Sequence, residues 1–121
     1  MGNNELEGTI PDIFKKMKHL VALDLHKNKL VGRLPSSISR LLSLEHLLLD
    51  HNALTGWLPT TLFSLARLRT MVLHHNKFYG SIPWEIGGLV QLHDLWLDHN
   101  VSYSTTTMST NIAAFVPHSC S

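Results

Sequence analysis

Most of the chemistry available to this 121-residue chain involves its nine histidines. Two columns of residues recur every 24 positions and hold His26, Asp50, His74 and Asp98 in the first, and Lys27, His51, His75 and His99 in the second. Imidazole and carboxylate groups at such spacing could bind zinc, or could change charge between about pH 5 and 8. Which of these they do depends on the elements that position them.

Three interpretations of these columns are open. Zinc needs three or four ligands that converge at about 2.0 to 2.1 Å. A flat ladder of strands points its side chains outward in parallel, so we expect no metal site. The plainer interpretation is a polar surface on which Asp and His alternate. The third is a pH-sensitive contact surface, where carboxylates favour a charged His74 while stacked His51, His75 and His99 disfavour one another's charge.

The rest of the composition argues against other kinds of chemistry. Cys120 is the only cysteine, so the chain can form no internal disulfide and no cysteine-based zinc site. Its one nominal thiol–imidazole pair, Cys120 with His118, lies in an irregular tail and does not resemble a catalytic cleft. We therefore expect no enzyme and no cofactor. A net charge of +1 without a basic cluster argues against nucleic-acid binding.

The sequence shows no secretory signal pattern and no apolar run of about 20 residues that could span a bilayer. We expect no membrane contact by this segment itself.

A 24-residue repeat organises the whole chain. The recurring polar and backbone-shaping residues are Asn4, Asn28, Asn52, Asn76 and Asn100, then Gly8, Gly32, Gly56 and Gly80, then Pro11, Pro35, Pro59 and Pro83. Seven apolar slots recur with them, as in Leu44, Leu47, Leu49, Leu54, Leu58, Leu62 and Leu65. One such unit, which we call a coil, cannot bury its own apolar slots. Stability must therefore come from stacking neighbouring coils.

Each part of a coil has a physical interpretation. Segments such as 44–49 alternate apolar and variable residues, which predicts a short strand with one buried face. The Asn suits a turn into the interior, because its carboxamide can pair backbone groups that the turn leaves open. The Gly permits a backbone conformation or close approach that a Cβ would obstruct. The Pro then begins a short helical turn, and apolar spacing of three favours a 3₁₀ helix.

These residues resemble the plant-type leucine-rich repeat, LxxLxLxxNxLxGxIPxxLxxLxx, which the unit 44–67 matches at nearly every slot. The resemblance covers residues 4–100. It implies an α/β fold: a right-handed solenoid with a concave parallel β-sheet and short 3₁₀ or helical turns on the convex side. It also implies relatives that bind without catalysing, among them ectodomains of receptor-like kinases and receptor-like proteins, and inhibitors of cell-wall enzymes.

The expected organisation is a solenoid over residues 1–100 followed by a Ser/Thr-rich tail over 101–121. The solenoid divides into a partial coil 1–19, whole repeats 20–43, 44–67 and 68–91, and a partial coil 92–100. Met1 falls in a strand-leucine slot, so we expect a fragment that begins within a coil. The tail is either disordered or folds back over the open end of the solenoid as a weak cap.

Variable strand positions are expected to carry specificity, because alternation points them outward. Leu48, Val72 and Trp96 form an apolar stripe that the core does not need, and such stripes often mark docking surfaces. The predicted partner-binding residues are Asp24, His26, Lys27, His46, Leu48, Asp50, His51, Thr70, Val72, His74, His75, Asp94, Trp96, Asp98 and His99. Trp57 and Trp84, at variable slots elsewhere, should be at least partly exposed.

The function expected from this resemblance is recognition of a protein or peptide ligand through the concave sheet of a receptor-like protein. The parent protein is then expected at the extracellular face of the plasma membrane or in secreted form. Two alternatives share the same repeat pattern: a secreted inhibitor of a cell-wall enzyme and an intracellular scaffold.

Overall fold

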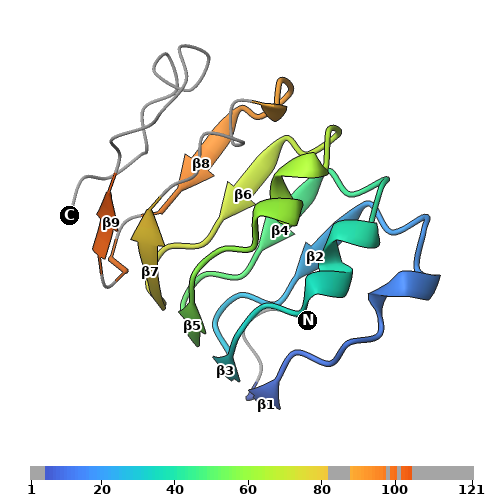
Figure 1. Cartoon of the computed structure of the whole chain (residues 1–121). Coiled ribbons are helices and arrows are strands. Elements are labelled where there is room, and N and C mark those ends of the chain that lie inside the picture. The colour runs from blue at the N-terminus through green and yellow to red at the C-terminus, as the bar shows by residue number, and fades with distance from the viewer. Residues whose placement is uncertain (1–4, 82–87, 98, 101, 105–121) are drawn as a thin grey trace.

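The computed structural model describes residues 5–81, 88–97, 99, 100 and 102–104 of the chain. The whole repeats 20–43 and 44–67 each contain a short strand, a turn, a second short strand and a 3₁₀ helix. The strands form two parallel rows that lie side by side along the molecule (Figure 1). The expected right-handed leucine-rich-repeat solenoid, with helical turns opposite a concave parallel sheet, is confirmed.

The concave sheet consists of β2 (Ala22–Asp24), β4 (His46–Leu48), β6 (Thr70–Val72) and β8 (Asp94–Trp96), in that order. Each residue pairs with the residue 24 positions later, as in Leu47 with Met71. The repeat length therefore sets the register. Because the register never slips, residues that share a slot in the repeat stand in a straight column across the sheet.

A second parallel sheet, which we call the lateral sheet, was not predicted. It consists of β1 (Glu7–Thr9), β3 (Lys29–Gly32), β5 (Ala53–Gly56), β7 (Lys77–Ser81) and β9 (Ser102–Ser104). The repeated glycines stand in these strands with positive φ, for example +86° at Gly56, where a side chain would be strained. Strand β9 pairs with β7, so the sheet extends beyond the expected end of the solenoid at residue 100.

Among the described residues the helical turns are η1 (Phe14–Lys16), η2 (Ser36–Arg40) and η3 (Thr60–Ser64), all of them 3₁₀ helices. Pro35 and Pro59 directly precede η2 and η3 with φ of −69° and −65°, as the sequence predicts. The corresponding Pro83 lies outside the described residues. In the described ranges no helix has the length and apolar character needed to cross a bilayer.

The core lies between the two sheets and the helical turns, and the repeated apolar slots fill it. Most slots of the central coil are fully buried, including Leu44, Leu47, Leu49, Leu62 and Leu65. Each buried leucine contributes about 1.5 to 3 kcal/mol relative to an exposed one. In the first whole coil Leu20, Leu23 and Leu25 are only partly buried against this core. Stacking of one coil on the next therefore supplies the burial that a single coil lacks.

The repeated asparagines link successive coils through hydrogen bonds. Asn76 Nδ2 donates to the carbonyls of Leu73 at 3.2 Å and Leu49 at 2.9 Å, and its Oδ1 accepts from the Leu54 amide at 3.0 Å. Asn28, Asn52 and Asn100 make equivalent bonds wherever the neighbouring coil is described. One carboxamide per coil thus satisfies backbone groups of two coils at the turn that leaves the concave sheet.

Candidate functional site on the concave sheet

A hollow of about 480 Å³ opens on the concave sheet just past the carboxyl ends of its strands. Its lining consists of His26, Lys27, Leu48, Asp50, His51, Val72, His74 and Trp96. All eight belong to the predicted partner-binding set. The repeat brings them together because all eight occupy three slots of the 24-residue unit, and each slot forms a column across neighbouring coils.

The remaining members of that set lie around the hollow. Asp24, His46, Thr70 and Asp94 belong to the strands and are half-buried, while His75 and His99 continue the column of Lys27 and His51. Asp98, which was predicted beside His74, lies outside the described residues. The same holds for Trp84 and for the expected cap or disorder over 105–121.

The second column adopts a backbone conformation that the repeat pattern did not reveal. Lys27, His51, His75 and His99 all have left-handed φ, between 54° and 56°. Few residues other than glycine tolerate this region, and histidine is among those enriched there together with Asn and Asp. Each of these residues directly precedes a ladder asparagine. Three of the nine histidines thus have a structural reason to occupy this slot.

The left-handed turn lays the histidine rings against one another. The rings of His51 and His75 stack with centroids 4.4 Å apart at 19°, and those of His75 and His99 stack at 4.1 Å and 12°. His74, from the neighbouring column, meets His51 edge-on at 5.0 Å and also lies 5.2 Å from the Trp96 ring. The predicted stack of His51, His75 and His99 is present. The ring of His74, from the first column, contacts the rings of His51 and His75.

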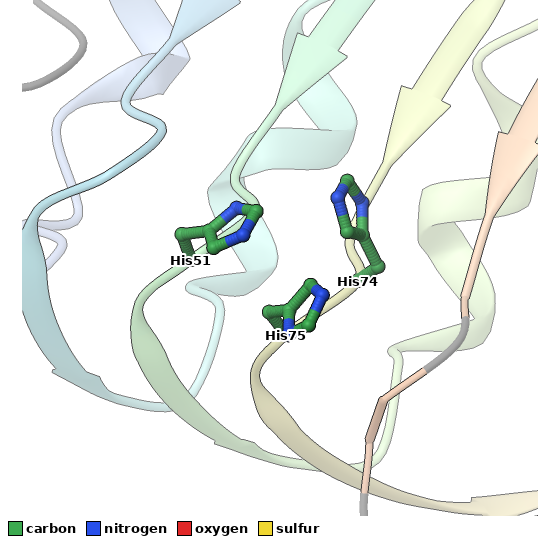
Figure 2. Close-up of side chains that lie close together, drawn as sticks. All are labelled: His51, His74 and His75. Atoms are coloured by element: carbon green, nitrogen blue, oxygen red, sulfur yellow. The ribbon is translucent and has the colours of Figure 1, made fainter. Parts of the chain in front are cut away.

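This arrangement differs from the parallel side chains that a flat ladder predicts. Ligand atoms of His51, His74 and His75 all lie within 4.8 Å of one another, and Figure 2 shows the three rings gathered at one point. The physical reason is the left-handed φ of His51 and His75, which directs their side chains differently from extended neighbours and brings them against the His74 ring. At these three positions the rings therefore lie closer together than the parallel side chains of a flat ladder would.

Asp50 is the second departure from expectation. Strand alternation predicts an outward and exposed carboxylate, yet the residue is only 7% exposed. Its Oδ2 lies 2.8 Å from Nδ1 of His51 and 4.0 Å from Nε2 of His74. The rings of the two columns close over it, which leaves a buried carboxylate beneath two imidazoles.

The apolar stripe is also less exposed than predicted. Val72 is only 9% exposed, whereas Leu48 and Trp96 are half-buried. In the sheet Val72 pairs directly with Leu48 on one side and Trp96 on the other, so two larger side chains flank it. Val72 therefore forms the floor of the hollow, and Leu48 and Trp96 form its apolar walls.

A further carboxylate–imidazole pair lies at the first strand. The Nδ1 atom and the backbone amide of His26 hydrogen-bond to Oδ1 of Asp24. Partial burial alone would raise the pKa of Asp24, but the hydrogen bonds and charge of His26 outweigh it and lower this pKa below its ordinary value. Asp24 is therefore an anionic group at the edge of the hollow.

The lateral sheet has an aromatic cluster that the columns did not predict as a unit. Trp57 is 59% exposed, as expected, and its ring lies 5.9 Å from that of Tyr79. The Arg33 guanidinium lies 6.0 Å from the centre of the Trp57 ring. These three residues come from β7 and from the ends of β3 and β5. Arg33 and Trp57 stand 24 residues apart in the sequence, and Trp57 and Tyr79 stand 22 apart. Only this spacing close to the repeat length could have indicated the two contacts.

Comparison with protein-family models identifies the repeat as a leucine-rich repeat. A family model described as leucine rich repeat matches residues 1–54, and a second with the same description matches residues 67–89. No curated protein matches the sequence.

Solved structures give closer matches. The ectodomain of the receptor kinase SOBIR1 from Arabidopsis thaliana is 30% identical over 95% of this chain, with a TM-score of 0.86. The ectodomain of GASSHO1/SCHENGEN3 from Arabidopsis thaliana, solved with CASPARIAN STRIP INTEGRITY FACTOR 2, is 36% identical over 83% of this chain, with a TM-score of 0.81. The BIR3–SERK2 complex from Arabidopsis thaliana is 33% identical over 90%, with a TM-score of 0.78. This chain spans 61%, 12% and 57% of the respective solved chains.

Proposed function

The chain belongs to the leucine-rich-repeat proteins, and from this premise we propose that it is a non-catalytic recognition module of a receptor-like protein. Its ligand is a peptide or a segment of another protein, and the docking surface is the hollow on the concave sheet. Neither nucleic acid nor a membrane is a partner of this segment. The parent protein acts at the extracellular face of the plasma membrane or is secreted.

The observation that carries this proposal is the composition of the hollow. Val72 forms an apolar floor between Leu48 and Trp96, and His26, Lys27, Asp50, His51 and His74 place polar groups around it. Sites for small ligands typically have an apolar lining with a few polar groups that fix orientation, and enclose about 300 to 1,000 Å³. A hollow of about 480 Å³ suits one or two side chains of an extended peptide, and Trp96 is the residue type most enriched among binding hot spots.

The structural relatives support a peptide ligand. RGFR1 is a plant peptide hormone receptor solved in complex with RGF2, and HAESA was solved with the peptide hormone IDA and the co-receptor SERK1. These proteins are receptors, which favours a receptor-like module over a secreted inhibitor of a cell-wall enzyme and over an intracellular scaffold.

A selection from a random peptide library tests this proposal. Peptides that bind the whole chain are expected to lose affinity about tenfold or more when Leu48 is changed to Thr, because the hollow loses an apolar wall. Thr is β-branched, a shape that strands favour, so the fold should be retained. The selection is carried out with a metal chelator present.

Val31→Thr is the matched control, because Val31 is an exposed apolar residue on strand β3 of the lateral sheet. This variant should bind the selected peptides as the unchanged protein does. Peptides that are insensitive to Leu48→Thr but sensitive to Val31→Thr would place the docking surface on the lateral sheet and overturn the proposal.

A further inference from the structure

We propose that His51, His74 and His75 form a zinc-binding site on the concave sheet. Each offers one ring nitrogen, and these atoms lie within 4.8 Å of one another. The three rings lie close together just past the carboxyl ends of β4 and β6 (Figure 2). Imidazole nitrogen suits zinc and other late transition metals, whereas calcium and magnesium prefer oxygen ligands.

The backbone holds these three residues in place. The His51 amide donates to the carbonyl of His74 at 3.1 Å, and the Asn52 amide donates to that of His75 at 3.2 Å. Asn52 and Asn76, the ladder residues directly after His51 and His75, tie the same turns to the interior. The site is therefore built on a hydrogen-bonded edge between two coils.

Only side-chain adjustment is needed to complete the coordination. Tetrahedral zinc with bonds of about 2.0 to 2.1 Å places its nitrogen ligands about 3.3 to 3.4 Å apart. The present separation of up to 4.8 Å exceeds this by about an ångström or more. The His51 and His75 rings now stack at 19°, so both side chains must rotate until their ring planes point at the ion. The His51 side chain is 40% exposed and the His74 side chain 15%, so neither ring is locked in the core.

The buried Asp50 provides the group that orients such ligands in zinc sites. Its Oδ2 lies 2.8 Å from Nδ1 of His51, where a protonated Nδ1 donates to the carboxylate. That tautomer leaves Nε2 of His51 with a lone pair for the metal. A divalent cation held by the three rings would also lie close to the Asp50 carboxylate, and the attraction between opposite charges favours its binding.

Three protein nitrogens leave the fourth position of a tetrahedral ion to water or to another ligand. That position would open into the hollow on the concave sheet, the same hollow that the proposed partner occupies. The zinc proposal does not rest on the docking proposal, because the ion binds to this chain alone.

Calorimetric titration of the whole, metal-free chain with Zn²⁺ at pH 7.5 tests the site. One ion per chain is expected. His51→Asn and His75→Asn should each weaken binding at least about tenfold, as should Asp50→Asn through the orientation of His51. Asn tolerates the left-handed backbone of positions 51 and 75, so both variants should fold. Thermal unfolding followed by circular dichroism verifies this.

His93→Gln is the matched control, because His93 is exposed and outside the cluster of three. This variant should bind zinc with the affinity of the unchanged protein. A second measurement does not depend on variants. Zinc should perturb the nuclear magnetic resonance signals of the His51, His74 and His75 rings more than those of the other histidines. Absence of zinc binding overturns the proposal. So does equal binding by the His51→Asn and His75→Asn variants, or perturbation centred on other histidines.

Discussion

At the scale of single residues, the slot before each ladder asparagine shows how one backbone angle shapes the candidate site. Its four occupants, Lys27, His51, His75 and His99, share a left-handed φ. Histidine tolerates that conformation better than most residue types, so its repetition is explained by the turn before any function is considered. The same turn lays the rings together, which makes the cluster available for binding.

Substitution at position 51 tests the left-handed turn. His51→Val should destabilise the protein by about 1 to 2 kcal/mol, because a β-branched residue is strained at φ of 56°. His51→Asn should be less destabilising, since it loses the same contact with Asp50 but keeps a permitted turn. Urea unfolding of both variants provides the measurement. His46→Val, on the extended strand β4, is the control and should be nearly neutral. Equal losses for the two position-51 variants would contradict the turn argument.

A second prediction at this scale concerns pH. The pKa of Asp24 is lowered in the folded state, so its carboxylate contributes stability above its ordinary pKa of about 3.8, and loses that contribution as pH falls through the lower folded value. The free energy of unfolding should therefore fall less steeply below pH 4 in Asp24→Asn than in the unchanged protein. Unfolding in urea at pH 5 and pH 2.5 measures the difference. Identical pH profiles would show that the His26 contact does not hold in solution.

The predictability of single residues follows their contribution to the core. Leucine slots such as Leu47 were predictable because burial demands an apolar side chain at every coil. The burial of Asp50 was not, because it depends on where the His51 and His74 rings lie, and ring position follows from φ. A variable slot constrains residue type too weakly to reveal a dihedral angle.

At the scale of elements, the concave sheet is easier to predict from the sequence than the lateral sheet. Strands of the concave sheet alternate buried and outward residues, as in β4, and this pattern was sufficient to predict them. Strand β3 of the lateral sheet has one buried residue, Leu30, followed by a glycine two positions later. Glycine is depleted in strands, so local propensity favours a loop there. The segment nevertheless forms a strand, because it pairs in parallel with the equivalent segments β1 and β5 of the neighbouring coils.

The asparagine ladder holds the elements of each coil together, and Asn76→Ala tests it. The change leaves the buried Leu54 amide without its acceptor, and it removes one of the two asparagine donors from each of the Leu49 and Leu73 carbonyls, which keep Asn52 and Asn100 respectively. An unpaired buried group typically costs about 1 to 3 kcal/mol and each lost hydrogen bond about 0.5 to 1.5 kcal/mol, so we expect a loss of about 2 to 4 kcal/mol. Urea unfolding measures it. Ser64→Ala, which removes one exposed hydrogen bond to Thr61, is the control. A loss no larger than that of the control would contradict the ladder's role.

At the scale of the whole molecule, stacking converts a one-dimensional repeat into a two-dimensional surface. A residue in one coil lies beside its counterpart 24 positions later, so reading the sequence in columns predicted the eight residues that line the hollow. The shape of the hollow was not predictable, because it depends on the burial of Val72 and on how the rings of neighbouring columns meet. The repeat spacing thus predicts which residues are neighbours, whereas the direction of their side chains depends on backbone angles that the spacing does not reveal.

The most direct test of the recognition surface is to map a bound peptide on the protein by nuclear magnetic resonance. A peptide from the library selection is added to isotopically labelled whole chain, and backbone amide shifts are followed residue by residue. The account predicts that the largest changes cluster at His26, Leu48, His74 and Trp96, around the hollow of the concave sheet. Changes that cluster instead on strands β3, β5 and β7 of the lateral sheet would contradict it.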